Sequence, residues 1–249
     1  MSGFVDVHSH MIPSGDDGVR SVDEGLALLR EAARRGTSVQ YGTPHANDTH
    51  PVTPARRART EAAHEQMAGV AAAFGLELRL GWELAPEPWL LDVDPTPYRL
   101  AGLRAALLEF PLPHTGARDL RVLTACVEHL ESAGLVPILA HPERSRPVQD
   151  ALHLAAAFRE RGCLLQLNAS SLLGHDDDRS RVAGVALLTD GLCDLVASDA
   201  HRAARPPYLD AAHALVTELV GPDDADRLLT GAALEAIAEQ EDAEVAPRR

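Results

Sequence analysis

The feature that most constrains the fold is a repeated alternation of short apolar runs with longer helical segments. About seven apolar runs have the length and composition of strands, from Phe4–Val7 to the run CDLVASDAH at 193–201. Segments with helical periodicity separate most of them. A parallel strand pair needs a crossover connection, usually a helix. The alternation therefore predicts an α/β fold with a largely parallel sheet covered by helices.

The expected helices leave no linker, internal repeat or low-complexity segment. They cover residues 22–35, 54–75, 118–134, 148–161, 180–190 and about 207–240, and the tail that follows is expected to fray. The chain has 249 residues, a length at which α/β barrels commonly form one domain. We therefore expect a single domain over residues 1–249, with one strand fewer than a complete eightfold barrel.

Two histidines stand two positions apart in the stretch VDVHSH, directly after the first apolar run. On a strand, residues i and i+2 face the same side, so His8 and His10 would converge on one point. Two convergent imidazoles suit a metal ion. Taken alone, an H-x-H pair is equally typical of ordinary hydrogen-bonded histidines.

Histidines and carboxylates also follow the other expected strands. They are Asp16, Asp17, His45, Glu83, Glu109, His141, Asp199 and His201. In α/β barrels the carboxyl ends of the strands carry the active site, so these residues would meet at one rim. An unpaired Glu109 amid apolar residues would cost several kcal/mol to bury. Structural roles remain open as alternatives to metal binding. Glu83 or Glu109 could form a salt bridge with an arginine, and Asp199 could cap the start of a helix.

With one aspartate counted from the adjacent pair Asp16 and Asp17, the set holds five histidines and four carboxylates. These nine residues exceed what one ion needs, so two or three divalent ions are expected. The set contains no cysteine, which favours manganese, iron or zinc. The remaining histidines are expected to be structural or solvated; they are His50, His64, His114, His129, His153, His175 and His213.

The composition excludes several classes of function. The net charge of −14 argues against general affinity for nucleic acid or anionic membranes. All 23 basic residues are arginine, so no lysine can form a Schiff base or a carbamylated metal bridge. Cys126, Cys163 and Cys193 lack C-x-x-C and C-x5-R spacings, which disfavours a disulfide framework and a thiol phosphatase. Without a signal peptide or an apolar run of about 20 residues, we expect a cytoplasmic protein with no membrane span.

Six motifs in order resemble the PHP (polymerase and histidinol phosphatase) superfamily: DVHSH, TPH, GWE, LLEFP, HPER and SDAH. The resemblance covers residues from about 5 to 210. It is closer to the bacterial PHP-type protein tyrosine phosphatases of capsule and exopolysaccharide synthesis. It implies a distorted (β/α)7 TIM-like barrel with a trinuclear metal site.

By this resemblance, nine residues are assigned to three ions. The first ion takes His8, His10, Glu83 and Asp199, the second takes Glu83 as a bridge with Glu109 and His141, and the third takes Asp17, His45 and His201. Asp17 is preferred to Asp16 because it directly precedes the glycine. Arg144 and Arg205 match arginines that bind the substrate phosphate. The loop ANDTHP after TPH departs from the family because it carries no arginine or lysine.

The implied activity is hydrolysis of a phosphomonoester by metal-activated water, without a cysteine nucleophile. The substrate would be a phosphotyrosine protein, for example a bacterial tyrosine kinase. Asp199, His201 or water could protonate the leaving group. Histidinol phosphate or another small ester is the alternative substrate. A metal amidohydrolase, a non-catalytic metal-binding protein and, less well supported, a PHP nuclease are further alternatives. The sequence leaves the oligomeric state open.

Overall fold

The computed structural model describes residues 3–111 and 117–238 of the chain. Its strands are β1 Phe4–Asp6, β2 Thr37–Gly42, β3 His45–Ala46, β4 Glu77–Leu80, β5 Glu83–Leu84, β6 Ala105–Glu109, β7 Val136–Ala140, β8 Leu164–Asn168 and β9 Leu195–Ala197. All pairings between them are parallel. The expected α/β class with parallel sheets is therefore confirmed. The predicted fraying tail and His114 lie outside the described residues.

The strands form two sheets, in the orders β1-β2-β4 and β3-β5-β6-β7-β8-β9. The expectation of about seven strands was wrong in detail, because two expected strands are each divided. Pro44 interrupts the first, since it has no N–H to donate. Gly81 interrupts the second, where a Cβ atom would lie 2.4 Å from Leu100 Cδ2. Single hydrogen bonds still cross both breaks, from Gly81 N to Gly42 O and from Glu83 N to Pro44 O.

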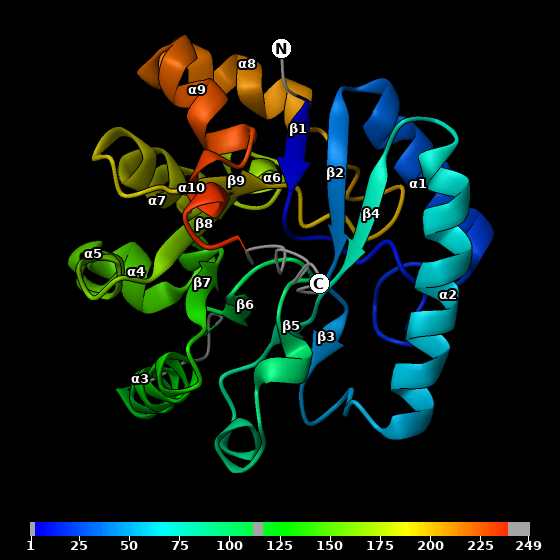
Figure 1. Cartoon of the computed structure of the whole chain (residues 1–249). Coiled ribbons are helices and arrows are strands. Elements are labelled where there is room, and N and C mark those ends of the chain that lie inside the picture. Colours follow the sequence, from blue (N-terminus) through cyan, green and yellow to red (C-terminus); the bar gives the residue numbers. More distant parts are fainter. Residues whose placement is uncertain (1–2, 112–116, 239–249) are drawn as a thin grey trace, which may run out of the picture.

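The helices lie outside the strands, as Figure 1 shows, with α1 and α2 beside β2 and β4. Their bounds are α1 Val22–Arg34, α2 Pro54–Ala72, α3 Ala117–Ser132, α4 Arg146–Asp150, α5 His153–Glu160, α6 Ala169–Leu172, α7 Asp178–Thr189, α8 Leu209–Val220, α9 Pro222–Leu229 and α10 Ala232–Glu235, with short 3-10 turns η1 Pro88–Asp92, η2 Thr96–Tyr98 and η3 Pro142–Arg144. No helix within the described ranges is long and apolar enough to cross a bilayer.

Two long predicted helices are interrupted in the structure. The segment 148–161 divides into α4 and α5 at Ala151, which has an extended φ of −155°. The segment 207–240 divides into α8, α9 and α10. Gly221 has a φ of +96° and is followed by Pro222, and Gly231 has a φ of +79°. Left-handed glycines and a proline at a helix start end one helix and begin the next.

Apolar side chains from both sheets share one internal cluster. Tyr41 of β2, Leu107 of β6, Ile138 of β7 and Leu195 of β9 belong to it, and each is at most 1% exposed. The segments that follow β1 and β9 also meet, through a parallel bridge between Ser9 and Ala200. The segments after the first and the last strand are thereby brought together at the position of the histidine pair.

Helix α1 packs closely against the segment that follows the histidine pair. A Cβ atom at Gly25 would lie 2.3 Å from the Met11 carbonyl oxygen. We expect Gly25→Ala to lower the free energy of unfolding by about 1–3 kcal/mol, since backbone has to move. Gly69→Ala in α2 is the control, because nothing lies within 4 Å of its Cβ position.

In that control, alanine should raise the free energy of unfolding by about 0.5–1 kcal/mol through its helix propensity. Urea denaturation of the two variants measures both effects. Equal stabilisation by the two substitutions would show that α1 is not held against this segment.

Candidate metal centre

The predicted site residues lie together at the carboxyl ends of the strands. Four groups have ligand atoms within 4.8 Å of one another: His8–His10–Glu83, His8–His141–Asp199, Glu83–Glu109–His141 and His10–Asp17–His45–His201. Every one of the nine residues assigned above belongs to at least one group. The grouping differs from the assignment by resemblance in two respects, because Asp199 groups with His141 and His10 joins the third set.

Glu83 lies at the centre of this cluster. Its Oε2 atom is 3.3 Å from His8 Nε2, 3.1 Å from His10 Nε2 and 2.9 Å from His45 Nδ1. Its other oxygen is 3.0 Å from His141 Nε2. The buried Oε2 atom nevertheless has no partner in hydrogen-bond geometry among the described residues, and neither has His141 Nδ1. A carboxylate oxygen that faces several imidazole nitrogens in this way fits a shared cation ligand.

Buried charges oppose one another within the cluster. Burial disfavours ionisation of Glu83, but the charges of His8 and His45 hold its pKa well below the usual range. Burial, reinforced by the Glu83 charge, raises the pKa of Glu109 to about 8. Burial also lowers the pKa of His141 to about 4, so its imidazole is neutral and able to bind a metal. Of these groups, His141 offers a neutral imidazole and Glu83 an ionised carboxylate, the donor types that a divalent cation requires.

Two cluster residues have a strained backbone. His141 has a φ of 40° and Asp199 a φ of 49°, and they are the non-glycine residues with positive φ among those described. Left-handed conformations cost non-glycine residues about 1–3 kcal/mol and occur preferentially at functional sites. His141 comes directly after β7 and Asp199 two residues after β9, and both side chains belong to the cluster.

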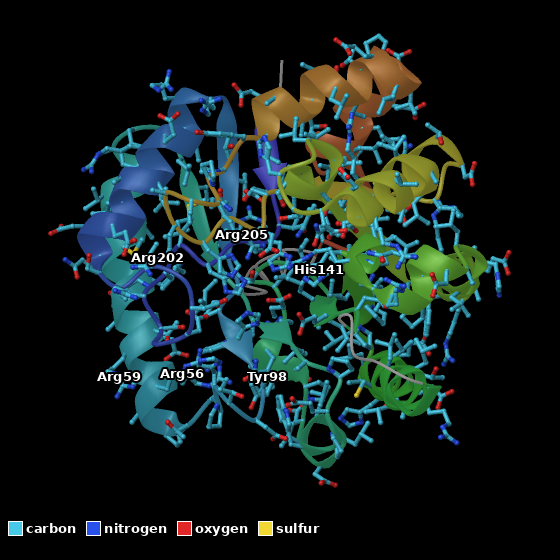
Figure 2. All side chains as sticks on the ribbon, turned by 180° about the vertical axis from the view of Figure 1, so that it is seen from behind. Arg56, Arg59, Tyr98, His141, Arg202 and Arg205 are labelled. Carbon is cyan, nitrogen blue, oxygen red and sulfur yellow. The ribbon has the colours of Figure 1, made fainter. Side chains whose placement is uncertain are left out.

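Asp199 connects the cluster to the two arginines. Its Oδ1 atom is 3.4 Å from His8 Nε2, and its Oδ2 atom accepts hydrogen bonds from Arg144 at 3.2 Å and from Arg205. The side chains of Arg144 and Arg205 remain 26% and 29% exposed, so they stand between the buried cluster and solvent. In Figure 2, Arg205 and His141 lie near the middle of the molecule.

Sequence reasoning missed a set of polar residues that orient the cluster. Gln166 Oε1 lies 2.9 Å from His8 Nδ1, and Gln166 donates to Asn168, which donates to Asp199 Oδ2 at 2.8 Å. Such partners direct the opposite ring nitrogen of a histidine toward a metal. The signal was present in the run CLLQLNASS, where two amides stand two residues apart within an apolar strand.

Asp16 has a similar position on the other side of the cluster. Its Oδ2 atom is 3.3 Å from His10 Nδ1 and accepts the backbone N–H of His45 at 2.9 Å. Asp17, by contrast, has its Oδ1 atom 3.4 Å from both His45 Nε2 and His201 Nε2. The two adjacent aspartates thus face different imidazole rings, Asp16 that of His10 and Asp17 those of His45 and His201.

Several other histidines make ordinary contacts. His64 and His129 bond to the carbonyl oxygens of Leu78 and Val93, and His213 bonds to Asp226. His50 lies closer to the cluster, because its ring stacks 6.2 Å from that of His45.

Solved structures share this fold. The chain matches a crystal structure described for YwqE from Bacillus subtilis and CpsB from Streptococcus pneumoniae, "unique metal-dependent tyrosine phosphatases", with a TM-score of 0.74, 24% identity and 87% coverage of both chains. An amidohydrolase from Mycoplasma synoviae matches with a TM-score of 0.62 and 13% identity, over 99% of this chain and 90% of that one. These likenesses establish a shared fold.

Sequence relatives are more specific. The tyrosine-protein phosphatase YwqE of Bacillus subtilis is 28% identical over 209 residues, 80% of this chain and 77% of that protein. The tyrosine-protein phosphatase CpsB of Streptococcus agalactiae is 27% identical over 242 residues, 90% of this chain and 94% of that protein. A model of the family described as "Capsular polysaccharide synthesis, CpsB/CapC" matches residues 4–238. The chain therefore belongs to the CpsB/CapC family of capsular polysaccharide synthesis.

Proposed function

We propose that this protein is a metal-dependent phosphatase that hydrolyses phosphotyrosine in proteins. The observation that carries the proposal is the buried histidine–carboxylate cluster with two arginines at its mouth. Membership of the family and the names of the relatives support the same reaction. A phosphotyrosine protein, for example a bacterial tyrosine kinase, is the proposed partner.

We propose that two or three divalent ions, with manganese preferred over iron or zinc, bind the clustered residues. The proposed ligands are His8, His10, Asp17, His45, Glu83, Glu109, His141, Asp199 and His201. When bound, such ions activate water and neutralise phosphoryl charge.

The arginines of the chain supply the remaining recognition of phosphate. The guanidinium groups of Arg144 and Arg205 suit the oxygens of a phosphate, and Asp199 holds both of them at the mouth. Burial opposes ionisation of Asp199, but His8 and Arg205 hold its pKa well below the usual range, so it is a poor proton donor. His201 bonds through Nδ1 to the Asp199 carbonyl oxygen, and its Nε2 atom lies 3.4 Å from Asp17 Oδ1. We therefore propose that His201 or solvent water, more readily than Asp199, protonates the leaving phenolate.

We also propose that the two sheets form one distorted (β/α)7 TIM-like barrel and that residues 1–249 make a single domain. The bridge between Ser9 and Ala200 and the apolar cluster shared by both sheets support this architecture. A cytoplasmic location is proposed because Cys126, Cys163 and Cys193 are free and buried, which suits a reducing compartment.

The test is a comparison of substrates in the presence of Mn²⁺. We expect phosphate release from a phosphotyrosine peptide with a kcat/KM at least about tenfold above that for histidinol phosphate. The opposite preference would assign the site to small phosphate esters. Metal binding without turnover of either substrate would favour an amidohydrolase or a non-catalytic metal-binding protein.

A further inference from the structure

A pocket with aromatic walls lies beside the metal centre, and the chemistry proposed above does not use it. Its volume is about 240 Å³. One wall is the loop that follows β3, with Pro51 and Val52. The other wall comes from η1 and η2, with Trp89 and Tyr98. We name it the aromatic pocket.

The loop wall of the aromatic pocket begins close to the metal centre, because the ring centroid of His50 in that loop lies 6.2 Å from the ring centroid of His45. Strands β3 and β5 pair with His45 opposite Glu83, and the pocket lining begins two residues after His45, at Asn47. A row of rings leads to the pocket from the residue before Glu83. Trp82 and Tyr98 pack edge to face with their ring centroids 6.4 Å apart, and the ring centroids of Tyr98 and Trp89 are 5.9 Å apart. Tyr98 is labelled in Figure 2, below His141.

The walls are held in place by hydrogen bonds and stacking. Glu87 accepts a bond from Trp89 Nε1 at 2.9 Å and from the backbone N–H of Asp48 at 2.7 Å, so it ties the two walls together. The guanidinium carbon of Arg57 lies 4.9 Å from the ring centroid of Tyr98, and Arg57 donates a hydrogen bond to the Pro97 carbonyl oxygen. A preformed pocket lowers the entropic cost of binding.

The chemistry of the lining selects its occupant. Val52, Trp89 and Tyr98 pack against the core on one side and remain partly exposed on the other. A cavity of about 150 Å³ is enough to bind benzene, so this pocket accommodates one large apolar side chain. The exposed Asp48 at the edge repels acidic groups.

We propose that the aromatic pocket is a specificity subsite that binds an apolar side chain next to phosphotyrosine in a polypeptide substrate. The inference rests on the proposed function, which it narrows from phosphate esters in general to phosphotyrosine segments with an apolar neighbour. A small phosphate ester could fill the metal centre but would leave this pocket unused.

The experiment compares phosphotyrosine peptides that differ at one position. Leucine, serine or aspartate is placed at each of the three positions on either side of the phosphotyrosine, and p-nitrophenyl phosphate serves as a substrate without neighbours. We expect leucine at one position to raise kcat/KM about tenfold over serine, the size of effect typical of one apolar group in a pocket. Aspartate there should lower kcat/KM below the value for serine.

Variants locate the effect. Val52→Asp and Trp89→Ala should abolish the preference for leucine while hydrolysis of p-nitrophenyl phosphate stays unchanged. Val182→Asp is the control, because Val182 is 70% exposed on α7 and lines a different pocket. Using two variants guards against loss of folding in either one, and circular dichroism verifies each.

Two results would overturn the subsite: equal kcat/KM for all peptides in the unchanged protein, or a leucine preference that survives in both pocket variants. Absence of turnover on every substrate with Mn²⁺ would instead contradict the proposed function. In that case, quenching of tryptophan fluorescence by the peptides still tests the pocket, because Trp89 lines it. Tighter binding of the leucine peptide, lost in Val52→Asp, would support the pocket, and equal binding would overturn it.

Discussion

Glu83→Gln should reduce phosphatase activity by at least about 10³-fold while leaving the protein folded. Glutamine preserves the volume of the side chain but removes the negative charge that faces His8, His10 and His45. A metal centre contributes several kcal/mol to stabilising the transition state. Each 1.36 kcal/mol corresponds to a factor of ten in rate, so loss of the central carboxylate gives an effect of this size.

The measurement is kcat/KM on p-nitrophenyl phosphate with saturating Mn²⁺, together with the metal content of the purified variant. Glu65→Gln is the matched control, since Glu65 is an exposed residue of α2. The control should behave like the unchanged protein. A Glu83→Gln protein with normal activity and normal metal content would remove Glu83 from the site.

Removal of divalent ions should abolish activity and lower the melting temperature by about 5–10 °C. An ion present at 100 times its dissociation constant stabilises the folded state by about 2.7 kcal/mol. For a protein of this size, each kcal/mol shifts the melting temperature by about 2–4 °C. The protein is treated with a chelator and dialysed, and activity and thermal unfolding are measured before and after Mn²⁺ is returned.

Both properties should recover when Mn²⁺ returns, and Glu83→Gln should show a smaller thermal shift. This second comparison separates specific binding in the cluster from general effects of salt. Full activity in protein shown by elemental analysis to contain no metal would contradict the proposed chemistry.

The sequence by itself determined the parallel α/β fold and which polar residues would meet. Both follow from simple geometric rules for strands. Residues i and i+2 of a strand face the same side, which predicts the convergence of His8 with His10. Parallel strands end at a common edge, which predicts that Glu83, His141 and Asp199 approach one another. The structure brings all three into one cluster.

The interruptions of the helices and strands could be predicted only in part from the sequence. Pro44 and the Gly221–Pro222 pair carry local signals, and their conformations follow from the backbone limits of proline and glycine. Gly81 differs from these positions, because the close approach of Leu100, which leaves no room for a Cβ atom there, comes from another part of the chain.

Only the tertiary structure decided the surroundings of the cluster. The contact of Asn168 with Asp199 depends on the register of β8 against β9, and that of Gln166 with His8 joins residues 158 positions apart. The aromatic pocket depends even more on the tertiary structure, since Trp89 and Tyr98 come from short 3-10 turns with no periodic pattern in the sequence. Strand periodicity and strand ends are local properties that a sequence displays. Register and the meeting of distant loops are set by the packing of the whole chain.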